Sequence, residues 1–373
     1  MGAALPDKLR YAFTPSGGYK EGTLYSLVPN DNVGNFDVSR TGVATRVNKD
    51  GLIEVVDANV PRLDYSDGGC PKLLTEVQSE NLIPYSEDFS QWTFSGDSLT
   101  SNYAISIDGT QNATRVVFSS SDELLRATTT LPMNVTCTAS IYIKGNKGDT
   151  IQISAGGVDD LKTLSGEWER IETTQTSTSP DMLIDTYGGA TARDILVWGG
   201  QLEQLPYPTS YIPNFGNSAG QTRGADSLTN FGSEQIIDSE SGILFFEGSV
   251  PTDEDSVWVA LTNDSNSTTT LSIGFEIGGA IRTYSRNNLG VIYTDAFTPL
   301  QTINSTYKFY LKYNETNVEF GVIGYYSNQS NSFPIYGSNS FTQLTLSRTS
   351  SLPFYGRIRQ VKHLPYNTDI TTL

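Results

Sequence analysis

The segment CTASIYI, from Cys137 to Ile143, has apolar residues at its odd positions and Thr, Ser and Tyr at its even positions. Successive residues of a strand point to opposite faces, so this alternation predicts a strand that is buried on one side. The segment Gly145–Asp149 (GNKGD) follows, and Gly and Asn accept positive φ at low cost, which is typical of a hairpin turn. Together they predict an antiparallel sheet with one buried face.

Strand-like segments continue on both sides of this hairpin. In the first half of the chain they are Thr114–Ser119, Thr136–Lys144, Thr150–Ala155, Glu167–Thr174 and Ile195–Glu203. A second series comprises Gly242–Val250, Ser256–Thr262, Thr270–Ile277, Ile281–Arg286, Gly290–Thr294, Tyr307–Tyr313, Val318–Tyr325, Thr342–Arg348 and Tyr355–His363. Short strands at this density are typical of a two-sheet jelly roll. We therefore expect an all-β chain with two antiparallel β-sandwich (jelly-roll) domains in tandem.

Length and local composition predict the domain boundaries. A chain of 373 residues exceeds one ordinary core, which favours two domains and an extra segment. Residues 1–80 have few periodic apolar runs, so we expect an irregular N-terminal arm that attaches and oligomerises the protein. Residues 81–213 and 231–373 are the two expected sandwiches. Residues 214–230 are rich in Asn, Gly, Ser and Thr and predict a linker.

Charge argues against several kinds of partner. The chain has 24 Lys and Arg against 41 Asp and Glu, a formal net charge of −17. It has no dense basic cluster, which disfavours nucleic acid, and its acidity disfavours anionic membranes.

Met1–Tyr11 lacks an apolar core of signal-peptide length, and we find no bilayer span. The two cysteines, Cys70 and Cys137, make a poor disulfide framework, which favours folding in a reducing cytoplasm.

Catalytic patterns are weak, and we expect no enzyme. His363 is the single histidine, and no nucleophile-elbow motif accompanies it. One histidine and two separated cysteines make a zinc site improbable. Glycan cleavage needs two carboxylates about 5–10 Å apart, a spacing that sequence cannot measure. Glu247 and Glu276 are candidates, so glycan depolymerase stays open as an alternative.

No cofactor is expected, although calcium is possible. Calcium often binds oxygen-rich loop tips in sandwiches, and Asp253, Asp255 and Asp264 lie in such loops. Solvated turns would have the same composition.

Sugar binding calls for aromatic faces that stack on the C–H side of a ring, flanked by groups that bond hydroxyls. The candidates in the second sandwich are Tyr284, Arg286, Asn287, Tyr293, Tyr325, Tyr326 and Asn328. A core or surface role remains open for each of them. Trp92, Trp198 and Trp258 are ambiguous, because large aromatic side chains on sandwich strands usually fill the core.

The segment Asn81–Trp92 (NLIPYSEDFSQW) resembles the opening of a carbohydrate-binding-module-like domain found in bacteriophage tail and fibre proteins. Such domains tend to close with a tryptophan-bearing strand and a Tyr-Ile-Pro turn, here Val197–Glu203 (VWGGQLE) and Thr209–Pro213 (TSYIP). Thr222–Asp226 (TRGAD) matches the segment that often comes next.

Two further segments extend the resemblance. Ala58–Tyr65 (ANVPRLDY), with Gly68–Pro71 (GGCP), is similar to the lead-in of that domain in phage structural proteins. The second strand series, which ends in Phe354–Val361 (FYGRIRQV), resembles the concanavalin A-like or laminin G-like sandwich.

The resemblance implies a phage virion component on a fibre, spike or vertex appendage, which attaches to the host by lectin-like binding of a bacterial surface glycan. It implies assembly in the host cytoplasm, exposure on the virion surface, and contacts with other virion proteins through residues 1–80. We expect a homo-oligomer, with a homotrimer favoured because symmetric display lets weak sites act together. A purely structural spike or connector subunit without a ligand is the alternative.

Overall fold

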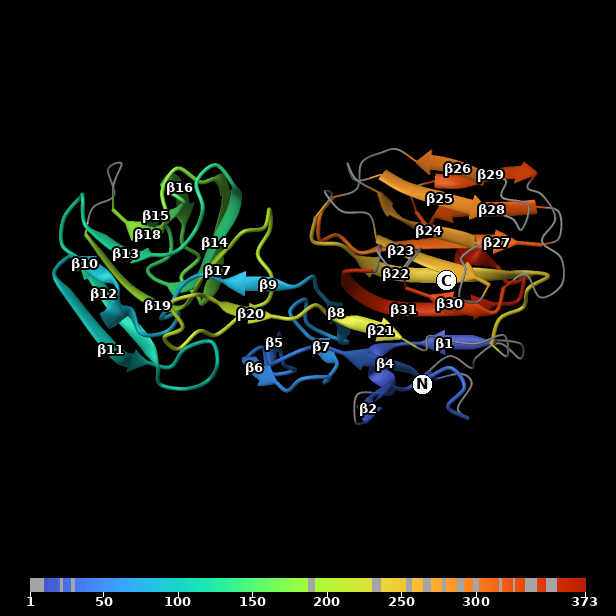
Figure 1. Cartoon of the computed structure of the whole chain (residues 1–373), viewed down its shortest axis with the longest axis horizontal. Coiled ribbons are helices and arrows are strands. Elements are labelled where there is room, and N and C mark those ends of the chain that lie inside the picture. The colour runs from blue at the N-terminus through green and yellow to red at the C-terminus, as the bar shows by residue number, and fades with distance from the viewer. Residues whose placement is uncertain are drawn as a thin grey trace. The chain divides into compact units, whose positions relative to one another are not determined.

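The computed structural model shows a chain of short strands (Figure 1). It describes residues 10–20, 23–27, 31–186, 192–229, 236–252, 257–263, 270–276, 280–286, 292–297, 302–314, 317–324, 326–332, 341–346 and 354–373. Only three 3₁₀ turns interrupt the β structure of these residues: η1 (Pro15–Gly17), η2 (Phe89–Gln91) and η3 (Ile370–Thr372). Within the same ranges, no helix has the length and apolar character needed to span a bilayer. The expected all-β class is confirmed.

The chain forms two compact units, and neither is a single continuous segment. Unit 1 contains Met1–Arg40, Asn59–Glu76 and Asp226–Leu373, and unit 2 contains Thr41–Ala58 and Val77–Ala225. The chain therefore passes from one unit to the other four times.

Unit 1 is a sandwich of two large antiparallel sheets. The eight-stranded sheet has the order β29 (Tyr326–Ser332), β28 (Asn317–Val322), β27 (Tyr307–Tyr313), β22 (Gly242–Ser249), β31 (Gly356–Leu364), β8 (Lys72–Thr75) and β7 (Arg62–Asp64), with β1 (Tyr11–Phe13) also paired to β31. The five-stranded sheet has the order β26 (Ile292–Phe297), β25 (Ala280–Arg286), β24 (Thr270–Glu276), β23 (Val257–Thr262) and β30 (Gln343–Thr345). Phe246 and Phe309 of the first sheet and Ile273 of the second are buried in one core, so the two sheets face each other.

The N-terminal segment is not the free arm that its composition predicts. In Figure 1 the blue strand β1 lies beside the red strand β31, and Tyr11 pairs with His363. Tyr11, Phe13 and Leu73 are buried in the core of unit 1. A small sheet, β2 (Tyr19–Lys20), β3 (Thr23–Leu24), β4 (Phe36–Ser39) and β21 (Ser227–Thr229), completes the unit. Tyr11, Phe13 and Leu73 thus find their partners in distant parts of the same chain.

The expected linker, residues 214–230, contains the passage from unit 2 to unit 1 between Ala225 and Asp226. It is also structured, because β20 (Gln221–Arg223) pairs with β9 (Ser79–Asn81) and β21 pairs with β4. The segment is short of apolar residues because its strands belong to small sheets.

Unit 2 is a second sandwich. One sheet has the order β10 (Thr93–Ser95), β13 (Leu124–Thr128), β18 (Asp181–Asp185), β15 (Thr150–Ala155) and β16 (Val158–Thr163). The other has the order β11 (Ser98–Ala104), β12 (Ala113–Phe118), β19 (Arg193–Glu203), β14 (Thr136–Lys144) and β17 (Glu169–Thr176). The hairpin β5 (Ala44–Val47) and β6 (Ile53–Val56) also belongs to this unit. Ile153 and Ile184 of the first sheet share a core with Ile141 and Val197 of the second.

Candidate functional site

The residues that carry the resemblance in unit 2 are largely buried and join its closing turn to its first strand. The Asn81 amide donates to the carbonyls of Gly200 at 3.1 Å and Ile212 at 2.8 Å. The fully buried Glu203 carboxylate accepts from Thr209 Oγ1 at 2.5 Å and from Gln201 Nε2 at 2.7 Å. A buried carboxylate needs such partners, so these motif residues stabilise the fold.

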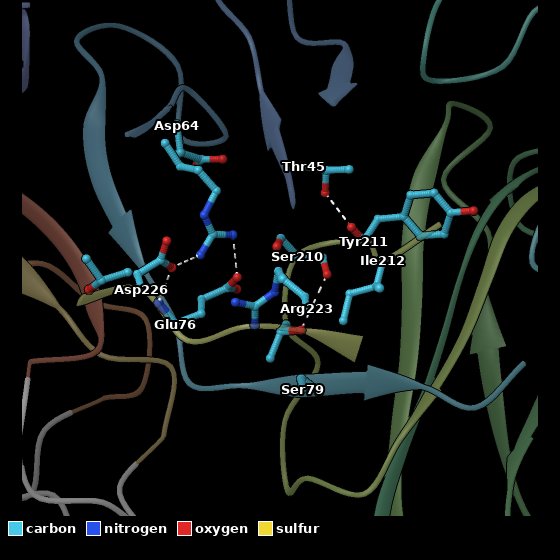
Figure 2. A network of polar contacts seen from close by, with 12 residues as sticks. Thr45, Asp64, Glu76, Ser79, Ser210, Tyr211, Ile212, Arg223 and Asp226 are labelled. Carbon is cyan, nitrogen blue, oxygen red and sulfur yellow. Dashed lines mark hydrogen bonds and ion pairs between the residues drawn. The ribbon is translucent and has the colours of Figure 1, made fainter. Parts of the chain in front are cut away.

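The three tryptophans that the sequence left ambiguous, Trp92, Trp198 and Trp258, are core residues. Trp198 is 2 % exposed and its ring centroid lies 4.6 Å from that of Tyr211. Thr45 donates to the main-chain oxygen of Tyr211 at 2.5 Å, as Figure 2 shows. A Cβ at Gly200 would lie 2.9 Å from the Trp92 ring, which explains a glycine there. Trp258 in unit 1 is also fully buried.

The motifs VPRLD and TRGAD meet in unit 1 through a buried ion-pair network. Asp226 accepts from Arg62 and, at 3.0 Å, from Arg40 Nη1, and Arg62 Nη1 donates to Glu76 at 2.5 Å. Figure 2 shows Asp226 and Glu76 side by side. The Glu76 and Asp226 backbones also bond each other, because Asp226 N donates to Glu76 O at 3.0 Å. Arg40, Glu76 and Asp226 are each the last or first residue of a segment of unit 1, so the network joins the ends of those segments within the unit.

His363 is buried beside Tyr313, with 2.8 Å between His363 Nε2 and the tyrosine hydroxyl oxygen. A Cβ at Gly242 would lie 2.5 Å from Nε2, so only glycine leaves room for the ring. Within the described residues, Nδ1 is buried without a hydrogen-bond partner. Burial, with a smaller effect of Arg10, lowers the pKa of His363 to about 4.

This burial predicts a loss of stability in acid. Between pH about 6.5 and 4 the unfolded state takes up a proton on His363 and the folded state does not, so stability falls by about 3 kcal/mol as pH drops through that window. His363→Gln should show a smaller decline in its free energy of unfolding. Since the chain has one histidine, its ring-proton NMR shift reports the folded pKa directly, and a midpoint near 6.5 would contradict this account.

The two carboxylates considered for glycan cleavage belong to different sheets. Glu247 is in β22 and lies 3.3 Å from Arg359, whereas Glu276 is in β24 and lies 3.3 Å from Arg282. Each is therefore paired with an arginine.

The predicted sugar-binding residues are spread over both sheets of unit 1. Tyr284 and Arg286 share the half-exposed face of β25. Tyr293 lies in the neighbouring strand β26, where its backbone pairs in register with Ser285. Tyr326 and Asn328 are in β29, at the edge of the other sheet.

The remaining predicted residues lie outside the described ranges: Asn287, Tyr325, Asp253, Asp255 and Asp264. Among the described residues, no group of three or more His, Cys, Asp or Glu is placed to hold a metal ion.

A depression of about 570 Å³ lies on unit 2. Its floor is a row across three neighbouring strands, because Leu196 of β19 pairs with Arg115 of β12 on one side and Lys144 of β14 on the other. Two loops line it as well, residues 145–147 after β14 and residues 165–167 before β17, and Tyr103 of β11 and Asp194 of β19 complete the lining.

Charged and aromatic groups cluster at the β11 side of this depression. Arg115 binds Asp194 through two hydrogen bonds, Nε at 2.8 Å and Nη2 at 2.6 Å. The guanidinium carbon lies 5.0 Å from the centroid of the Tyr103 ring, and Tyr103 remains 50 % exposed. These hydrogen bonds with Arg115 are the main reason that the pKa of Asp194 is lowered. An exposed aromatic ring thus stands beside a fixed charged pair in a concave surface.

Sequence reasoning missed this site. Tyr103 is the penultimate residue of a polar strand, SLTSNYA, which has no apolar alternation. Arg115, however, interrupts the apolar pattern of β12 (ATRVVF). A charged residue within a predicted sandwich strand is the feature of the sequence that could have indicated this site.

No family model and no curated protein matches the chain. Among solved structures, the CBM40 domain of the Ruminococcus gnavus IT-sialidase bound to α2,3 sialyllactose is 13 % identical, with a TM-score of 0.29 over 34 % of this chain and 76 % of that chain. Domains LG4-5 of the mouse laminin α1 chain are 10 % identical, with a TM-score of 0.25 over 79 % of this chain and 96 % of theirs. The LG1-3 region of the laminin α2 chain is 10 % identical, with a TM-score of 0.23 over 68 % and 66 %. The chain is similar to these proteins in being built of antiparallel β-sandwiches.

Proposed function

We propose that this chain is a non-enzymatic glycan-binding protein and that its ligand binds in the depression of unit 2. The main observation behind this proposal is the half-exposed Tyr103 ring beside the Arg115–Asp194 pair. Sugar sites combine a ring that stacks on C–H groups with fixed polar groups that bond hydroxyls. A row of residues on adjacent strands holds such groups rigidly, which lowers the entropy lost on binding.

The finer proposal is a bacteriophage virion protein that attaches to the host surface, as an oligomer and preferably a trimer. It is supported by the motif resemblance around Asn81–Trp92 and Val197–Pro213 and by a composition without helical segments. One shallow site should bind weakly, and symmetric display would supply avidity. A structural spike or connector subunit without a ligand is the competing function.

Tyr103→Ala is expected to weaken glycan binding by the full chain about three- to tenfold, because a stacked ring contributes about 0.5–1.5 kcal/mol beyond its buried area. Binding is measured on an array of bacterial surface glycans. Tyr85→Ala is the matched control, because Tyr85 is an exposed tyrosine of the same unit that does not line the depression. Equal binding by Tyr103→Ala and the unsubstituted chain would contradict the proposed site. Failure of the full chain to bind any glycan would favour the structural alternative.

The non-enzymatic proposal has its own test. A glycosidase needs a general acid whose pKa is raised, whereas Arg115 lowers the pKa of Asp194 and keeps it ionised at neutral pH. We therefore expect no release of reducing sugar when the full chain is incubated with host polysaccharide. Release of reducing ends by the full chain would overturn this proposal, and loss of that release in Asp194→Asn would place the activity in the depression.

A further inference from the structure

The depression differs in charge from the unit that contains it. Unit 2 has ten Lys and Arg residues and twenty Asp and Glu residues, a net charge of −10. The depression is lined by three of those ten cations, Arg115, Lys144 and Lys147, and by only two carboxylates, Asp194 and Glu167. It is thus a small positive region on an acidic protein.

Two of the three cations already have partners. Arg115 binds Asp194 through Nε and Nη2, which leaves the N–H groups of Nη1 out of that pair. Lys144 Nζ donates to Glu167 at 3.0 Å. Across the described part of the chain, the Lys147 ammonium makes no ion pair. Among the cations that line the depression, Lys147 and Arg115 Nη1 are therefore the groups without a carboxylate partner in the described residues.

The backbone that carries Lys147 is held in place. Gly148 N donates to Leu164 O at 2.9 Å, and Leu164 N donates to Asp149 O at 2.8 Å. Gly166 has a φ of +98°, and a Cβ there would lie 3.1 Å from the Lys147 Cβ, so the two lining loops are in close contact. The hairpin expected at Gly145–Asp149 is not formed, because β14 and β15 belong to different sheets. Lys147 instead lies on a held loop between these two sheets, at the wall of the depression.

We infer that the depression selects a sugar that bears an anionic substituent, a carboxylate or a phosphate. The inference rests on the proposed glycan-binding function and adds the ligand class to it. The anionic group pairs with Lys147 and with Arg115 Nη1, while the ring stacks on Tyr103. Such partly exposed charges are screened by salt, so the preference for acidic sugars should weaken as ionic strength rises.

The test uses matched pairs of immobilised glycans that differ only in the acidic group: a uronate oligosaccharide and its carboxyl-reduced form, and a phosphorylated oligosaccharide and its dephosphorylated form. The full chain is expected to bind one or both acidic members more tightly than their neutral partners, and the two pairs distinguish carboxylate from phosphate. Lys147→Gln should lower the acidic-to-neutral ratio about two- to fivefold. Lys49→Gln, which removes an exposed cation of the same unit outside the depression, should leave the ratio unchanged.

Equal binding of the two members of each pair, or tighter binding of the neutral ones, would overturn the inference while glycan binding itself stands. A preference for acidic sugars that survives Lys147→Gln would overturn the assignment to this depression. Absence of binding to every member, acidic and neutral, would overturn the proposed function together with the inference.

Discussion

Removal of residues 1–76 is expected to unfold unit 1. The deletion takes β1, β7 and β8 from the eight-stranded sheet. It also takes five large buried side chains from the core, Tyr11, Phe13, Leu24, Phe36 and Leu73. Burial of one such side chain contributes about 1.5–3 kcal/mol, so their loss, about 8–15 kcal/mol, matches the whole stability of a typical domain.

The fragment 226–373 is what remains of unit 1 once residues 1–76 are removed. The measurement compares this fragment with the full chain by near-UV circular dichroism and urea unfolding. We expect the fragment to lack a cooperative transition. The fragment 77–225 is the control, because it contains all ten strands of the two large sheets of unit 2 and should fold. A cooperatively folded 226–373 fragment would show that the N-terminal strands are dispensable, as the arm hypothesis requires.

Asp226→Ala is expected to lower the free energy of unfolding by about 3–5 kcal/mol, because it leaves the guanidinium groups of Arg40 and Arg62 buried without their shared carboxylate. Both arginine side chains are fully buried, so water cannot replace the lost partner. The free energy of unfolding is measured by denaturant titration of the full chain.

Asp194→Ala is the matched control for this substitution. It breaks the Arg115 pair, in which both side chains are at least one-third exposed, and such pairs contribute about 0–1 kcal/mol. If Asp226→Ala lowers the free energy of unfolding no more than Asp194→Ala does, the buried network does not stabilise unit 1.

Local patterns predicted most strands of the C-terminal half. Gly242–Val250, Thr270–Ile277 and Tyr307–Tyr313 agree with β22, β24 and β27 to within a residue at each end. The strand β29 was not predicted and lies between the expected segments Val318–Tyr325 and Thr342–Arg348, because its sequence, YSNQSNS, has no apolar alternation. It lies at the edge of its sheet.

Long-range pairing could not be predicted from periodicity. Nothing near Tyr11 indicates that its strand pairs with His363, 352 positions later. For the same reason, the ion pair between Arg62 and Asp226 could not be predicted, because their two motifs lie 164 positions apart. An apolar segment that is too sparse for its own core is equally compatible with a partner subunit and with a distant part of the same chain.

The candidate site was missed for a related reason. Sequence reasoning sought tyrosines next to polar residues along the chain, such as Tyr325 and Tyr326 before Asn328. The depression instead takes Tyr103, Arg115 and Lys144 from three strands, and only the register of the sheet brings their positions together.

The central claim is that a glycan binds at Tyr103 in unit 2, whereas the sequence predicted a site at the tyrosines of the C-terminal sandwich. One measurement distinguishes the two: attachment of the full chain to bacterial surface glycans, compared among the unsubstituted chain, Tyr103→Ala, and the double variant Tyr325→Ala/Tyr326→Ala. We predict that Tyr103→Ala weakens attachment about three- to tenfold and that the double variant attaches normally. Normal attachment by Tyr103→Ala together with loss of attachment by the double variant would contradict the account and place the ligand on the C-terminal sandwich.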